Sequence, residues 1–543
     1  MKKLGFLFFT FLALSLIIGC ATIGGRGQEI RLNTEVVIVG AGGAGYAAGL
    51  EALRAGRDVV IIEKHPTITG GNTGVAGSAA NAANMPLIRS LNMQITDGER
   101  DFIERMINEY WDYPDYIVRG WARTLRPVWD AHRAAYPALF FDHPSLHALQ
   151  TYYGGSGVAK PSFVHRLAHE ALAAFAWLEG LDGPGGGGWL TDRLPAAVGA
   201  TWRRSHTPNF YWGTLGANFF RPVEAAFLQE GGRLYMGHRA DTIIMENGRA
   251  VGVSGTTVAG QRFVVRASRG VMLATGGFAA NREMLNQHNR WWPEGFMGVG
   301  HTNLEHIQGD GIVMAARAGA NLIDMEWIQM VSALGSVMEG GAITNVMMIN
   351  TDGNRFIRED HRRDLLCLGI ITQPGQIVWG IQDGHTIDDI LGGHTWGANI
   401  PFDQWVAALP AHRKMADTLQ DLASQIGVPY ATLRGHIDAF NRAVEGTAPC
   451  PFGRMVFQYP INKPPFVAVQ ATANIHHTMG GVDVNDNMQA LAVGGGVIPG
   501  LYAAGEVIGG VHGDNRLGAN AITDILVFGR HAGKILGGPE LRP

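Results

Sequence analysis

One segment near the start of the chain constrains the fold more than any other. An apolar run at 36–39 leads into GAGGAG at 40–45, and a helical pattern follows over 46–55. A second apolar run at 59–62 ends at Glu63. A GxGxxG turn between a strand and a helix, with an acidic residue closing the next strand, is typical of dinucleotide-binding βαβ units. The sequence therefore predicts an α/β fold with a Rossmann-like nucleotide-binding domain.

The residues of this segment have distinct expected tasks. Gly40, Gly42 and Gly45 would permit the tight turn and let the N-terminus of the helix meet a pyrophosphate. Glu63 would accept hydrogen bonds from the ribose hydroxyls of the adenosine.

Composition narrows the class of protein further. Glycine accounts for 75 of 543 residues, about 14% against an average usage of about 7%. No Gly-X-Y period is present and 46% of the residues are hydrophobic, which excludes collagen-like and disordered chains. A net charge of −4 with 17% charged residues gives no basic surface for nucleic acid. The length predicts two or three domains.

The N-terminus has the layout of an export signal. Residues 1–20 contain Lys2-Lys3, an apolar run over 4–18, and Gly19-Cys20. This resembles a bacterial lipoprotein signal, in which Cys20 becomes the lipidated first residue. The alternative is a membrane helix, but the apolar run is shorter than the ~20 residues needed to span a bilayer. We expect an exported protein anchored by lipid on the periplasmic or cell-surface side. The three cysteines have neither zinc spacing nor a CxxCH haem motif, so no metal site is predicted.

Two further segments favour FAD over a nicotinamide cofactor. The first is Gly70-Gly71-Asn72-Thr73, followed by small residues at 79–83 that could pass close to a flat ring system. The second runs from the apolar segment ending at Glu506 to a helix start that includes Ala521 and Ile522. A helix N-terminus of small residues can stabilise negative charge on a reduced flavin. Distant halves of the chain thus converge on one long cofactor.

Seven motifs in one order carry a resemblance to a known family. They are GxGxxG at 40–45, GGNT at 70–73, ATGGF at 274–278, GDG at 309–311, DGxRF at 352–356, HHTMGG at 476–481 and AAGEVxGGVHGxNRLGxNA at 503–521. From about residue 34 to 533 the chain resembles the flavoprotein subunit of the fumarate reductase and succinate dehydrogenase family, including soluble fumarate reductases and urocanate reductase. The resemblance adds Gly277 and Asp310 to the expected FAD-binding residues.

The resemblance implies a two-part architecture. An FAD-binding domain would be built from 31–293 and 463–543, with an inserted α+β capping domain at 294–462. Residues 115–160 are extra relative to the family and rich in aromatic residues and histidine. They are expected to be packing decoration, with a lid or a partner surface as the alternative.

The resemblance also assigns catalytic roles. Family reductases move a hydride from the flavin to one alkene carbon while an arginine of the cap protonates the other. Here that arginine is Arg363, and its glutamate neighbour is Glu339. His476 and Arg516 match the residues that hold a substrate carboxylate. The alternatives are a surface arginine in a basic loop for Arg363, and a structural histidine beside the flavin for His476.

Three departures from the family bear on the substrate. The residues that bind the second carboxylate of fumarate are replaced by Val331 and Met338, and a second arginine of the proton relay is replaced by Ala342. Two apolar residues would leave a second carboxylate buried without a partner. We therefore expect reduction of an α,β-unsaturated monocarboxylate of the acrylate, cinnamate or urocanate kind.

Two other functions stay open. One is a 3-ketosteroid-type FAD dehydrogenase, and the other is a non-catalytic flavin-binding lipoprotein that carries electrons. No haem motif and no convincing site for covalent FMN is present in the sequence. A separate electron donor, a cytochrome or an FMN protein, is therefore expected.

Overall fold

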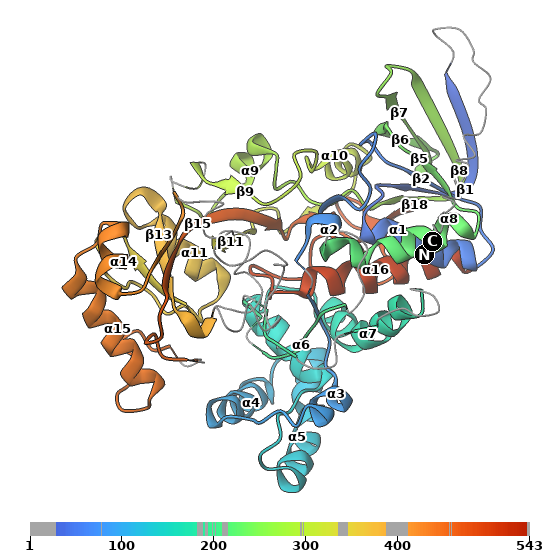
Figure 1. Ribbon diagram of the computed structural model, residues 1–543. Coiled ribbons are helices and arrows are strands. Elements are labelled where there is room, and N and C mark those ends of the chain that lie inside the picture. Colours follow the sequence, from blue (N-terminus) through green and yellow to red (C-terminus); the bar gives the residue numbers. More distant parts are fainter. Residues whose placement is uncertain are drawn as a thin grey trace, which may run out of the picture.

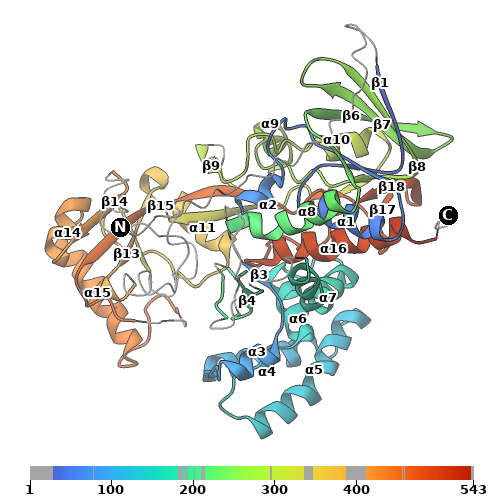
Figure 2. The same ribbon diagram turned by 45° about the vertical axis from the view of Figure 1, so that its right-hand side comes forward.

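The computed structural model shows a larger body, a cap beside it and a helical lobe below (Figures 1 and 2). It describes residues 29–77, 79–181, 188–189, 194–197, 199–200, 202–208, 215–293, 296, 298–334, 346–386, 411–454, 457 and 459–539.

The larger body is centred on a sheet that joins the two ends of the chain. Eight of the described strands form it, in the order β17-β18-β8-β1-β2-β5, with β7 and β6 continuing from β8. β1 pairs in parallel with β2 and β8, and β8 pairs in parallel with β18. The strands are β1 (Ile30–Val39), β2 (Val59–Ile62), β5 (Arg233–Tyr235), β6 (His238–Glu246), β7 (Arg249–Thr257), β8 (Arg262–Leu273), β17 (Gln489–Leu491) and β18 (Val497–Ala503).

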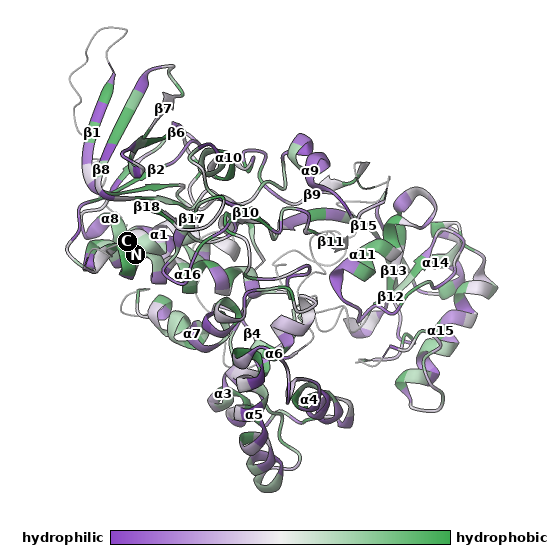
Figure 3. Ribbon diagram, turned by 180° about the vertical axis from the view of Figure 1, so that it is seen from behind, coloured by the Kyte–Doolittle hydropathy of each residue, from purple (hydrophilic) through white to green (hydrophobic). Residues whose placement is uncertain are grey.

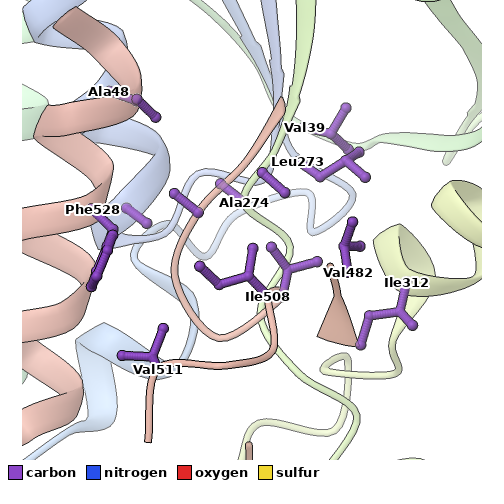
Figure 4. Packing of buried hydrophobic residues seen from close by; sticks show 14 of the residues in the cluster. Val39, Ala48, Leu273, Ala274, Ile312, Val482, Ile508, Val511 and Phe528 are labelled. Atoms are coloured by element: carbon purple, nitrogen blue, oxygen red, sulfur yellow. The ribbon is translucent and has the colours of Figure 1, made fainter. Parts of the chain in front are cut away.

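Helices α1 (Gly43–Arg54), α8 (Arg221–Gln229) and α16 (Asn520–Gly537) lie together along one side of this sheet (Figure 1). Glycines let α1 and α16 approach closely, because a Cβ on Gly529 or Gly533 would press on the α1 backbone. The hydrophobic core fills the space between these helices and the strand ends (Figure 4). Residues 36–39 and 59–62 are fully buried, as expected for central parallel strands covered on both faces.

The helical lobe consists of α3 (Met85–Ser90), α4 (Asp97–Tyr110), α5 (Tyr116–Ala135), α6 (Pro144–Gly154) and α7 (Pro161–Glu179). Thr96 and Glu99 form a capping box at the start of α4. α5 carries both hydrophilic and hydrophobic residues (Figure 3) and is amphipathic. Its buried side includes Trp121 and Trp129. Five aromatic residues of 115–160 belong to a second hydrophobic core, which favours packing decoration over a lid, whereas Tyr116, Tyr136 and Tyr153 are exposed.

The cap contains a second sheet, which α11 (Arg363–Ile371), α14 (Leu419–Ile426) and α15 (Tyr430–Val444) accompany. Six described strands form it, in the order β11-β15-β13-β12, with β14 and β9 also paired to β15. They are β9 (Gly300–His301), β11 (Ile328–Leu334), β12 (Met347–Asn350), β13 (Val378–Gln382), β14 (Arg413–Ala416) and β15 (Phe466–Thr478). The predicted domain boundary at 463 lies just before β15. This strand of the cap sheet therefore falls in the segment that was assigned to the FAD-binding domain.

Shorter elements complete the fold. They are α2 (Gly71–Val75), α9 (Arg282–His288), α10 (Asp310–Arg317), β3 (Ala80–Asn81), β4 (Ser205–His206), β10 (Leu322–Ile323), β16 (Gly481–Val482) and 3-10 helices at Leu215–Phe219 and Pro374–Gln376. No helix of the described ranges is long and apolar enough to cross a membrane. The predicted signal at 1–20, with Cys20, lies outside the described residues.

Candidate active site

The turn after β1 opens a narrow cavity of about 90 Å³. Gly40 has a φ of +108° and turns the chain, and a Cβ on Gly45 would overlap the Gly40 carbonyl oxygen. Gly42 lines the cavity, and the atoms nearest to a Cβ placed on it are 3.9 Å away. The turn thus presents backbone and open space at the start of α1, as a pyrophosphate requires.

Glu63, at the end of β2, is buried and lines the same cavity. Its carboxylate accepts hydrogen bonds from the backbone N–H groups of Ala41 (3.0 Å) and His65 (2.8 Å). Asp310 lines the cavity from the start of α10 and pairs with Lys64 at 2.6 Å. Burial opposes ionisation of Asp310, but the hydrogen bond from Lys64 prevails and lowers its pKa. Both carboxylates are therefore held in fixed positions where a nucleotide would lie.

The GGNT segment links this cavity to a second one. Gly70 donates a backbone hydrogen bond to the Ala41 carbonyl oxygen (2.8 Å), and the Thr73 hydroxyl accepts from Gly43 N–H (3.2 Å). Gly70 and Gly71 line the first cavity, whereas Asn72 and Thr73 line both cavities. The two cavities adjoin at these shared residues, as a dinucleotide cofactor with its ring system in the second cavity would require.

The second cavity has a volume of about 390 Å³ and lies where the larger body meets the cap. The cap contributes Arg363 and the neighbouring side chains of Val331 and Ser332. The C-terminal part of the chain contributes His476, Arg516, Ala521 and Ile522, among others. Most of the predicted catalytic, substrate-binding and flavin-ring residues thus meet in one place.

Arg363 is the first residue of α11 and only 7% exposed. The loop before it is fixed by a buried network in which Glu359 accepts hydrogen bonds from Arg355 (2.6 Å) and Arg454 (2.9 Å). Gly199 passes so close that a Cβ there would come within 2.6 Å of the Arg363 side chain. The surface-arginine alternative for Arg363 is therefore wrong.

Arg516 is 3% exposed and donates to the Leu517 carbonyl oxygen at 3.2 Å. Burial, followed by repulsion from Arg363, lowers the pKa of Arg516 to about 9. Two buried guanidiniums thus face one cavity. A bound anion would offset both the burial and the repulsion.

Two adjacent histidines stand beside these cations. His476 Nδ1 lies 2.7 Å from the Thr302 hydroxyl, and His477 Nδ1 lies 3.5 Å from Glu506. Burial, followed by the charge of Arg516, holds the pKa of both rings well below the ordinary 6.5. Both are neutral at pH 7. If the Thr302 hydroxyl donates to Nδ1, His476 retains an Nε2–H for a substrate oxygen.

Glu506 lines both cavities and accepts hydrogen bonds from the backbone N–H and hydroxyl of Thr478 (3.1 and 3.4 Å). Burial raises its pKa to about 7. Gly277 lines neither cavity. A Cβ on it would collide with Glu506 and Thr478, so this glycine allows the carboxylate to come close.

A hydrogen-bond network that the sequence did not predict supports the start of α16. Asn520 Oδ1 accepts from Asn81 Nδ2 (2.9 Å) and lies 3.0 Å from His147 Nε2, while Asn520 Nδ2 donates to the Thr151 hydroxyl (3.1 Å). Ala519, with a φ of +67°, precedes the helix. The available signal was Asn81, a polar residue within the small-residue stretch at 79–83.

The structure describes one of the two predicted second-carboxylate positions, Val331, which is 5% exposed and lines the cavity. The hydroxyl residues Ser332, Thr302 and Ser205 line the same cavity. Ser332 and Thr302 were missed in the sequence because a lone hydroxyl residue carries no motif. Met338, Glu339 and Ala342 lie outside the described residues.

The sequence model of a family described as "FAD binding domain" matches residues 35–111 and 135–522. Residues 112–134 are unmatched, a shorter insertion than the predicted 115–160. The family and the cradle of glycines agree, so the prediction of FAD is confirmed. When bound, FAD would be held by the GxGxxG turn, Glu63 and the GGNT segment.

Curated relatives include reductases of small unsaturated carboxylates. The chain is 30% identical over 539 residues to NADH:acrylate oxidoreductase of Vibrio harveyi, covering 93% of this chain and 50% of the relative. It therefore spans about half the length of that protein. It is also 30% identical over 519 residues to urocanate reductase of Eggerthella lenta, covering 93% of this chain and 75% of the relative.

Solved structures show the same architecture. The open conformation of a flavocytochrome c3 fumarate reductase is similar with a TM-score of 0.67 and 27% identity, covering 94% of this chain and 79% of that one. A 3-ketosteroid-Δ4-(5α)-dehydrogenase from Rhodococcus jostii RHA1 is similar with a TM-score of 0.66, 22% identity and 94% and 98% coverage, which shows the fold alone. The chain belongs to the FAD binding domain family, alongside the fumarate, acrylate and urocanate reductase flavoproteins.

Proposed function

We propose that this chain is an FAD-dependent reductase of α,β-unsaturated monocarboxylates. The observation that carries the proposal is the pair of buried guanidiniums, Arg363 and Arg516, in one cavity with a neutral His476. A carboxylate fits this site because it supplies the negative charge that two cations require and accepts two charge-assisted hydrogen bonds.

Each residue then has one role. Arg516 and His476 hold the carboxylate, and their hydrogen bonds strengthen as enolate-like charge develops on it. Reduced FAD would supply the hydride to the β carbon of the alkene. Arg363 donates a proton to the α carbon, so that one C=C bond becomes two C–H bonds. An arginine can act as an acid here only because the dry site makes proton transfer concerted with the growth of charge on carbon.

Glu339 is proposed to return the proton to Arg363. The family's next relay arginine is Ala342 in this chain, so we propose that water resupplies Glu339.

The wall of the cavity supports a monocarboxylate rather than fumarate. A second carboxylate placed against Val331 would lose hydration without gaining a hydrogen-bond donor from this side chain, at a cost of several kcal/mol. An apolar or aromatic remainder would instead contact Val331, Ala197 and Pro195.

The two other functions fit the cavity less well. A neutral steroid would leave both guanidiniums without a counter-charge. A carrier without turnover would have no need of two buried cations beside the flavin position.

We further propose that the protein is exported, anchored by lipid at Cys20, and supplied with electrons by a separate cytochrome or FMN protein. Its relatives support only the substrate class; the anchor and the donor rest on the sequence.

The test is a substrate panel with the purified, FAD-loaded chain and reduced viologen as donor. Acrylate, cinnamate and urocanate should each be compared with fumarate and with a 3-ketosteroid. We expect kcat/KM for at least one monocarboxylate to exceed that for fumarate by at least about 100-fold, the equivalent of a buried unpaired carboxylate. Turnover of fumarate alone, or of the steroid alone, would reject the proposal.

A further inference from the structure

A single guanidinium, next in sequence to the cavity residue Arg363, joins three parts of the molecule. Arg362, the residue before Arg363, donates to both oxygens of Asp364 (3.1 and 2.8 Å). It also donates to Asp514 Oδ1 (3.3 Å) and to the Ser156 hydroxyl (3.1 Å). Arg362 and Asp364 belong to the cap, Asp514 to the C-terminal part of the larger body, and Ser156 to the turn that ends α6.

Two partners of Arg362, Ser156 and Asp514, lie in segments that pack against each other. A Cβ on Gly155 would overlap the His512 carbonyl oxygen, and one on Gly513 would overlap the Gly155 carbonyl oxygen. Asn515 Nδ2 donates to the Gly154 carbonyl oxygen at 3.1 Å. The turn after α6 is thus pressed against the loop 510–518, which carries Arg516. Because Arg362 contacts Ser156 and Asp514, it is bonded to the two segments that hold the Arg516 loop in place.

The arrangement answers an electrostatic problem of the site. Arg363 and Arg516 repel each other across the cavity, and this repulsion acts to push the start of α11 away from the loop 510–518. Arg362 lies between two acidic side chains, Asp364 and Asp514, and pairs with both. The Arg362–Asp514 pair therefore attracts the two segments that Arg363 and Arg516 push apart.

We propose that Arg362 is a positioning residue, whose guanidinium ties the start of α11 to the Arg516 loop and so holds Arg363 over the bound substrate. This inference rests on the proposed function for the role of Arg363. The side chain of Arg362 is 23% exposed, so the tie can open and close as substrate enters and product leaves.

The chain contains a matched control. Arg358 lies four residues before Arg362 in the same loop, and its side chain is 26% exposed. Both of its hydrogen bonds within the described residues go to Asp360, inside the cap (2.8 and 3.0 Å). Substituting Arg358 removes an arginine of similar exposure without touching the larger body.

The experiment compares Arg362→Ala, Arg362→Lys, Asp514→Ala, the double variant Arg362→Ala/Asp514→Ala and Arg358→Ala, all loaded with FAD. Three quantities are measured: kcat and KM for an unsaturated monocarboxylate, the Kd of its saturated analogue from flavin absorbance, and amide hydrogen exchange over 361–366 and 512–518.

We expect kcat of Arg362→Ala to fall about tenfold, the worth of one partly buried ion pair, while KM and Kd change less than about threefold. The double variant should be no slower than Arg362→Ala, Arg362→Lys should recover part of the loss, and Arg358→Ala should match the wild type. Amide hydrogen exchange over 361–366 and 512–518 should rise only in the variants that lack the Arg362–Asp514 contact. Equal kcat for Arg362→Ala and Arg358→Ala, or losses that multiply in the double variant, would overturn the inference.

The two proposals fail in different ways. A wild-type protein that turns over no unsaturated carboxylate rejects the proposed function, yet raised exchange in Arg362→Ala alone would still support the tie. Unchanged exchange in an active enzyme would reject the tie and leave the proposed function in place.

Discussion

The two adjoining cavities form the two ends of the site, and they are built in different ways. The nucleotide end is lined by seven glycines among residues from several separate segments, with Glu63 held by two N–H groups. The substrate end is formed by side chains from the cap and from the C-terminal part of the chain, and two of them are buried cations. Binding of the cofactor therefore depends on close approach of backbone, whereas chemistry depends on charge. Changes at one end should leave the other end intact.

The largest expected effect is at Arg363. Arg363→Lys keeps a positive charge but shortens and reshapes the donor, so we expect kcat to fall roughly 10³-fold or more while the FAD content stays at one per chain. Steady-state kinetics with reduced viologen and the flavin absorbance measure the two quantities. Arg358→Lys serves as the control. Loss of FAD together with kcat would mean that the two ends are not separable.

The reciprocal change is at Gly45. Gly45→Ala would drive a methyl group into the Gly40 carbonyl oxygen and distort the turn, and we expect FAD binding to weaken by about 100-fold, or about 3 kcal/mol. Gly120→Ala, on α5, meets nothing within 4 Å and should be neutral or slightly stabilising. Equilibrium titration with FAD would separate the two. Equal affinities would contradict the role given to this glycine.

A smaller effect is expected at the apolar wall. Val331→Thr preserves shape and adds a hydroxyl that can donate to a second carboxylate. The ratio of kcat/KM for fumarate to that for acrylate should rise about 3- to 10-fold. Val258→Thr, at an exposed turn that does not line the substrate cavity, should leave the ratio unchanged. A ratio that does not move in Val331→Thr would show that another residue excludes the dicarboxylate.

The smallest effect concerns pH. Burial raises the pKa of Glu506 from an ordinary 4.5 to about 7, so the folded chain binds this proton more tightly than the unfolded chain. Its contribution to the free energy of unfolding is full below about pH 4.5 and is lost as the pH rises toward 7. Glu506→Gln should remove this decline. Denaturant unfolding of flavin-free wild type and variant between pH 4.5 and 7.5 would measure it.

The neighbouring histidines work in the opposite direction. His476, His477 and His512 have lowered pKa values, so their contribution is lost as the pH falls below 6.5. Because the variant keeps these histidines, the difference between the two pH profiles isolates Glu506. Parallel profiles would show that Glu506 does not titrate in this range.

The features of the fold and of the site that could be predicted from the sequence are local, or are carried by a motif. The βαβ unit with Glu63 follows from contiguous patterns, and the family resemblance brought Arg363, His476 and Arg516 together from three distant segments. In contrast, the contacts His147–Asn520, Thr302–His476 and Arg362–Asp514 were missed. Each joins isolated polar residues far apart in the chain, and their meeting depends on how whole elements pack. No periodicity or spacing encodes such a pair.

The long strand β15 has a mechanical consequence. It lies within the sheet of the cap along most of its 13 residues, and its last residues include His476 and His477. A β-strand of that length spans roughly 40 Å, and its pairing with β11 is irregular at His476. We expect any swing of the cap to move the His476 imidazole, which we propose holds the substrate, while Arg516 stays with the larger body. Opening of the cavity and loss of the contact between His476 and the ligand would then occur in a single movement, and product could leave without a separate release step.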